Sequence, residues 1–157
     1  MKANYFFRMS LAEFFLFLTL WFFYGLMIES ENLNSYPFYN HNLIEAIVER
    51  GHFYIDGSPT SLFHNRTDTF LFGGHIYSNK QPGMAMTGAL LYFVLKLFGL
   101  TYSTSYLLTT GLITFFTGSF FLALSAVFVL RLAHLFCCRD QTVYWPLLTT
   151  LIYALAT

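Results

Sequence analysis

Two long apolar runs dominate the hydrophobic pattern of this chain. Residues 10–28 carry a single charge, Glu13, and residues 106–130 carry none. At 1.5 Å per residue, helices over these runs would be about 28 and 37 Å long, close to or above the ~30 Å hydrocarbon core of a bilayer. Both runs are therefore predicted to be transmembrane helices. Glu13 is expected to face protein, because a carboxylate is costly in lipid.

A third apolar run, residues 143–157, begins beside Trp145 and Pro146. Proline is tolerated in the first turn of a helix, where its missing N–H has no partner to lose. At about 22 Å this helix would be too short to cross. We interpret it as the start of a further transmembrane helix, in a chain that ends in mid-helix.

Residues 84–100 are apolar but short, and Lys96 lies inside them. Basic residues precede the first run (Lys2 and Arg8, in residues 1–9) and follow the second (Arg131, His134 and Arg139, in residues 131–142). Such residues favour the cytoplasmic side, so both segments are predicted to be cytoplasmic. That arrangement favours an interfacial or re-entrant helix over residues 84–100; a transmembrane helix is the alternative.

The mixed segment between the first run and this helix, residues 29–83, is predicted to be extracytoplasmic. Apolar and charged residues alternate over residues 42–50 with helical spacing, and Gly51 follows, which is typical of a helix end. This amphipathic helix would suit a membrane surface. Residues 53–55 and 70–72 read as short extended pieces, and residues 56–59, which begin with Asp56, read as a turn.

Composition supports this class of protein. The chain has 157 residues, of which 56% are hydrophobic and 10% charged, whereas soluble domains carry roughly 25% charged residues. We therefore predict an all-α, polytopic integral membrane protein, in the plasma (inner) membrane. The zero formal net charge predicts no nucleic-acid partner. The outer histidines lack the close spacing of zinc ligands, so no metal site and no cofactor are predicted.

The segment with the most informative chemistry is residues 73–83, Gly-Gly-His-Ile-Tyr-Ser-Asn-Lys-Gln-Pro-Gly. It is polar, punctuated by glycines, and lies between apolar runs with Lys80 beside a proline. A basic and aromatic loop at the lipid boundary indicates contact with an anionic group there, and the phosphate of a lipid carrier is the natural candidate.

Taken together, these motifs resemble a known family. An anchor, a helix reading L-I-E-A-I-V-E-R-G, an I-D piece, the string G-H-I-Y-S-N-K-Q-P-G and an apolar helix ending L-F-G follow in order. This order is similar to the start of the polyprenyl-phosphate-sugar-dependent glycosyltransferases of the GT-C fold, which include the protein mannosyltransferases and the aminoarabinose transferases of lipid A. Lys80-Gln81-Pro82-Gly83 resembles their K-P-P motif with the first proline replaced. The resemblance covers nearly the whole chain but only the N-terminal part of a family member.

The resemblance implies sugar transfer from a polyprenyl-phosphate donor to an acceptor on the outer face of the membrane. Such a reaction needs a base for the acceptor proton and donors that hold the leaving phosphate. Lys80 would bind the phosphate, with His75 and Tyr77 as further donors. The family's carboxylate aligns near residues 36–38, where none stands, so Glu29 and Glu31 are the catalytic candidates. A divalent cation is left open.

Each of these residues also has a simpler interpretation. Lys80 could snorkel toward headgroups, Glu29 and Glu31 could mark the end of a span, and Asp56 could serve only the turn. The alternative function is a small non-catalytic membrane protein whose outer segment binds a membrane-protein partner.

Overall fold

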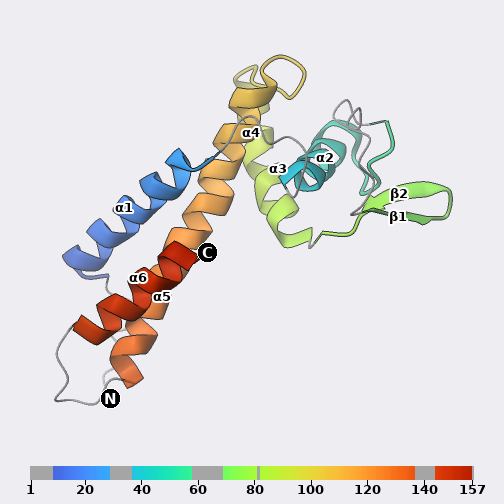
Figure 1. Ribbon diagram of the computed structural model, residues 1–157. Helices are drawn as coiled ribbons and strands as arrows, with labels where there is room; N and C mark the ends of the chain where they lie inside the picture. The colour runs from blue at the N-terminus through green and yellow to red at the C-terminus, as the bar shows by residue number, and fades with distance from the viewer. Residues whose placement is uncertain (1–8, 29–36, 58–68, 81, 137–143, 157) are drawn as a thin grey trace. The chain divides into compact units, whose positions relative to one another are not determined.

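The computed structural model describes residues 9–28, 37–57, 69–80, 82–136 and 144–156 (Figure 1). Of these residues 74% are helical, in five helices, and one β-hairpin accompanies them. The chain divides into two compact units. Unit 1 comprises Met1–Met27 and Ser119–Thr157, and unit 2 comprises Ile28–Gly118.

Unit 1 is built from three apolar helices, α1 (Leu11–Leu26), α5 (Phe120–Phe136) and α6 (Tyr144–Ala156). Ser10 and Glu13 form a capping box that starts α1, each side chain bonding to the other's backbone N–H. The buried side chains of the three helices pack together as one cluster: Phe17, Leu20, Tyr24, Ala123, Ala126, Val127 and Ala154.

An ion pair joins α1 to α5. Arg131 donates from Nε to Glu13 Oε1 at 2.8 Å and from Nη2 to Glu13 Oε2 at 3.0 Å. This bidentate geometry is the strong form of an arginine–carboxylate pair. Glu13 lies at the start of α1 and Arg131 near the end of α5, while Phe17 packs against Phe120 at the other end of α5. The two helices are therefore antiparallel, and the charge inside the first apolar run faces protein as expected.

Unit 2 is built around a helix that changes its winding. α2 (Pro37–Glu45) continues into the π-helix η2 (Ala46–Arg50), and Gly51 ends it with a φ of 73°. Glycine suits this left-handed position because it lacks a Cβ. The hairpin of β1 (Thr69–Phe72) and β2 (His75–Ser78) precedes α3 (Pro82–Leu97), as Figure 1 shows.

The core of unit 2 lies where α2 packs against α3 and against the start of the long helix that follows α3. That helix begins as α4 (Tyr106–Thr114) and passes through the π-helix η4 (Phe115–Ser119) into α5. The buried residues of this core are Leu43, Ile44, Ile55, Ala85, Ala89, Tyr92, Tyr102 and Ile113. Ile76 of β2 packs against it, and the Ile55 N–H donates to the Ile76 carbonyl at 2.8 Å, which ties the hairpin to the helices.

Within the described ranges, one helix is long and apolar enough to cross a membrane, the continuous run Tyr106–Phe136 of 31 residues. It contains the predicted span 106–130. The other apolar helices are shorter than predicted: α1 and α3 have 16 residues each and α6 has 13. A polytopic arrangement therefore stays a prediction.

Two structural predictions need correction. The chain is mostly helical but not all-α, because β2 occupies part of the segment interpreted as a polar loop. The apolar face of the helix over residues 42–50 is not left for a membrane surface. Leu43 and Ile44 are buried in the protein core, with 4% and 2% of their surface exposed.

Gly88 of α3 allows the close approach of α2. A Cβ at this position would lie 2.4 Å from Ile44 Cδ1, 3.1 Å from Ile44 Cγ1 and 3.3 Å from Ile113 Cγ2. A side chain here would have to displace two buried residues at once.

Gly88→Val is therefore expected to lower the free energy of unfolding by about 1–3 kcal/mol, the usual cost of overpacking a core. Gly111→Val is the matched control, because nothing lies within 4 Å of a Cβ at Gly111. Unfolding by SDS in mixed micelles would measure both. Equal stability of the two variants would contradict the close approach.

His41 is a buried polar residue that joins three parts of unit 2. It is 4% exposed, and its Nδ1 lies 2.8 Å from Tyr102 Oη and its Nε2 3.2 Å from Thr114 Oγ1. A neutral imidazole has one donor and one acceptor nitrogen, and a hydroxyl can complement either. Burial lowers the pKa of His41 to about 4.

Stability should consequently fall on acidification. Between pH 6.5 and 4 the unfolded chain binds a proton at His41 that the folded chain excludes. The free energy of unfolding should therefore be lower by roughly 3 kcal/mol at pH 4. Unfolding of the wild type and of His41→Gln at pH 7 and pH 5 would test this. The variant should lose less stability between the two values; an equal loss would show that His41 is not the group responsible.

Candidate functional site

The structure describes some of the predicted site residues and not others. Glu29 and Glu31 lie outside the described residues. His75 and Tyr77 lie on β2, and Lys80 lies two residues beyond it, where its backbone N–H donates to Ser78 Oγ at 3.2 Å. The hairpin brings His75 and Tyr77 together, and Lys80 follows where the chain turns into α3.

Strand pairing gathers aromatic rings on one face of the hairpin. Phe70 is paired with Tyr77 and Phe72 with His75, and side chains two apart on a strand share a face. The Phe70 and Tyr77 rings are stacked, with centroids 5.4 Å apart. Tyr54 joins this face through an isolated bridge to Tyr77.

Tyr54 is sandwiched between two histidines. Its ring stacks on His52 at 3.5 Å with an 11° angle, and on His75 at 4.1 Å with a 23° angle. Stacking against Tyr54 fixes the plane of the His75 ring, while 47% of the His75 side chain stays exposed to solvent.

His75 forms a hydrogen-bonded pair with Asp56. Its Nδ1 lies 2.7 Å from Asp56 Oδ2. Because an ionised carboxylate only accepts hydrogen bonds, Nδ1 must carry the proton, and Nε2 of the neutral ring is then an acceptor. A histidine oriented in this way by a carboxylate is the arrangement of a general base.

Asp56 is itself held from several directions. The Ile76 N–H donates to Asp56 Oδ1 at 2.7 Å, and the Arg50 guanidinium donates to the Asp56 carbonyl oxygen. Arg50 also binds Glu45, Nη2 to Oε2, at 2.7 Å. Partial burial raises the pKa of Asp56, but the bonds from Ile76 and His75 outweigh it and leave the pKa below its ordinary value. The carboxylate is therefore ionised at neutral pH, as the pair requires.

From the sequence, Asp56 was assigned to a turn, Tyr54 to a short extended piece, and His52 only to the outer histidines considered as metal ligands. Asp56 and His75 are 19 positions apart, and only the pairing of residues 54–55 with β2 brings them together. The one available signal was the extended piece at residues 53–55, which needed a partner strand.

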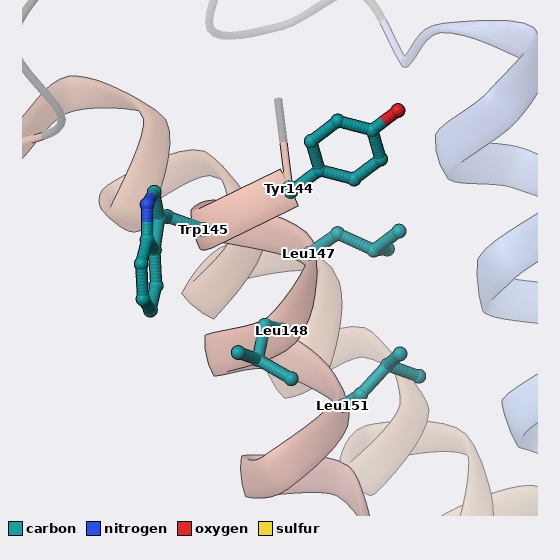
Figure 2. Close-up of a pocket in the computed structure, with 5 residues that line it drawn as sticks. All are labelled: Tyr144, Trp145, Leu147, Leu148 and Leu151. Carbon is teal, nitrogen blue, oxygen red and sulfur yellow. The ribbon is translucent and has the colours of Figure 1, made fainter. Parts of the chain in front are cut away.

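Two other features do not offer chemistry of this kind. Among the described residues no group of three or more histidine, cysteine or acidic side chains is arranged to hold a metal ion. An open recess of about 300 Å³ lies on α6, as Figure 2 shows, and its lining is almost wholly apolar: Tyr144, Trp145, Leu147, Leu148 and Leu151.

Comparisons with protein-family models, with curated proteins and with solved structures found no match to this chain. The candidate site therefore rests on the geometry of Asp56 and His75.

His75→Ala should raise the pKa of the Asp56 carboxyl toward its ordinary value, because it removes the hydrogen bond and the electrostatic interaction by which His75 lowers that pKa. Selective ¹³C labelling and NMR titration would measure it. Glu49 is the control: burial raises its pKa, but Lys96 and Tyr92 hold it low, and neither contact involves His75. An unchanged Asp56 pKa would mean that the pair does not form in solution.

Proposed function

We propose that this chain is the N-terminal part of a membrane glycosyltransferase, which transfers a sugar from polyprenyl phosphate to an acceptor hydroxyl outside the plasma membrane. The observation that carries the proposal is the Asp56–His75 pair on the exposed face of unit 2. The string that ends in Lys80 and Pro82 supplies the resemblance on which the donor is inferred.

The arrangement of unit 1 supports the proposed topology. In it, α1 crosses outward and α5 crosses back, which agrees with their antiparallel packing and with the Glu13–Arg131 pair at one end. The N-terminus and residues 131–142 are then cytoplasmic, and unit 2 is extracytoplasmic. In this proposal α6 begins a further transmembrane helix of the polytopic fold.

The proposed reaction uses three residues of unit 2: Asp56 in a turn, His75 on β2, and Lys80 just beyond β2. His75 Nε2 takes the proton of the acceptor hydroxyl, and Asp56 stabilises the imidazolium that results. The acceptor oxygen forms a bond to the anomeric carbon as the bond from that carbon to the phosphate oxygen breaks. The Lys80 ammonium stabilises the charge on the departing lipid phosphate. In this proposal His75 takes the role of base that Glu29 and Glu31 were expected to fill. Tyr77 contributes to the aromatic face of the hairpin, where it stacks on Phe70.

A second candidate function is favoured by a different observation. The outer surface of α6 presents exposed apolar side chains, among them Leu148, Ile152 and Leu155. Such a surface suits a helix of a membrane-protein partner, as expected of a non-catalytic assembly protein.

The test is transfer of a radiolabelled sugar from polyprenyl phosphate in membranes that contain the full-length protein. His75→Gln and Asp56→Asn should each lower the rate by about 10²–10⁴-fold, the usual contribution of a positioned base. Lys80→Ala should weaken use of the donor.

His134→Gln is the matched control, because His134 is exposed at the end of α5 and should leave the rate unchanged. If Glu29→Gln/Glu31→Gln abolishes transfer while His75→Gln does not, the base assignment is wrong. If wild-type membranes show no transfer and the protein copurifies with another membrane protein, the second function holds.

A further inference from the structure

The α3 helix is apolar on both of its faces. Its inner face packs into the core through Ala85, Gly88, Ala89 and Tyr92. Its outer face carries large apolar side chains at helical spacing, all exposed: Met86, Leu90, Phe93, Val94 and Leu97. Leu90 and Leu97 are 74% and 71% exposed. A helix that is hydrophobic all round is characteristic of an apolar environment on both sides.

The polar groups of α3 are satisfied within the protein. Lys96 Nζ donates to Glu49 Oε2 at 2.5 Å, and the Tyr92 hydroxyl donates to Glu49 Oε1 at 2.7 Å. The Thr87 hydroxyl lies within hydrogen-bond distance of two carbonyl oxygens in its own helix, those of Gly83 and Met84. Lys96, the charged residue within the apolar sequence of α3, is thus paired with Glu49 of η2. The outer face is free to contact hydrocarbon, where unpaired polar groups are costly.

The same contacts count against a spanning orientation. η2 lies along the inner face of α3, and it brings Glu49 and Arg50 with it, next to Glu45. If α3 crossed the bilayer, these ionised side chains would lie at the depth of the hydrocarbon core. At 16 residues α3 is about 24 Å long, shorter than the ~30 Å core.

We infer that α3 lies along the membrane boundary, with Met86, Leu90, Val94 and Leu97 in the lipid and η2 on the water side. The occupant of this surface is bilayer lipid, because the next helix of unit 2, α4, is the start of the run long and apolar enough to span. The inference does not depend on the proposed chemistry: failure of the sugar-transfer assay would leave it standing.

The test is site-directed spin labelling of the full chain in phosphatidylcholine–phosphatidylglycerol vesicles, with Cys137 and Cys138 replaced by serine. Single cysteines are placed at 86, 90, 94 and 97, which are exposed positions whose replacement spares the core. Position 103, in the loop after α3, is the control for water, and position 128, exposed on α5, is the control for lipid.

The expected result at all four α3 positions is a ratio of oxygen to nickel-chelate collisions several-fold above that at 103, with nearly constant depth. A spanning helix would instead change depth by about 16 Å between 86 and 97. That gradient, or nickel access equal to that at 103, would overturn the inference. Low access to both reagents would show a protein neighbour and would overturn it as well.

Discussion

The packing of α2 against α3 at Ile44 and Gly88 is the constraint on which unit 2 depends. The missing side chain at Gly88 lets the two helices approach, and this brings the following turn, η2, alongside the rest of α3. Glu49 then meets Lys96 and Tyr92, while Arg50 reaches the carbonyl of Asp56. One close contact between apolar groups thus fixes the position of the ionic groups that follow it.

The candidate site is a product of this arrangement. Arg50 holds the backbone at Asp56, the β2 backbone holds its carboxylate, and Tyr54 holds the plane of the His75 ring. Each support comes from a different segment of the chain, so the Asp56–His75 pair requires the whole of unit 2 to be folded. A pair with this many supports has little freedom to reorganise, which is the condition for efficient proton transfer.

Helices and turns that depend on neighbouring residues could be predicted from the sequence. Contacts between residues that lie far apart in the chain could not. The apolar runs, the helix ended by Gly51 and the extended pieces at 53–55 and 70–72 are local patterns. The structure has helices at the first two kinds and β1 over 70–72, whereas 53–55 holds only an isolated bridge at Tyr54. Asp56 does lie in a turn, as predicted. The pairing of β2 with Tyr54 is not local, so the contact of Asp56 with His75 and the hairpin itself were not predicted. Lys96 counted as a charge within an apolar helix because its partner, Glu49, lies 47 positions away.

The π-helix η2 carries a consequence for how unit 2 tolerates change in length. Its wider winding places one more residue in the turn than an α-helix would, and two successive side chains, Glu49 and Arg50, leave it for different partners. Loss of one residue between 46 and 50 would allow this turn to return to α-helical winding, with the downstream chain close to its present orientation. It would also remove one of the positions from which Glu49 and Arg50 reach their separate partners, so the extra residue of this turn serves those contacts.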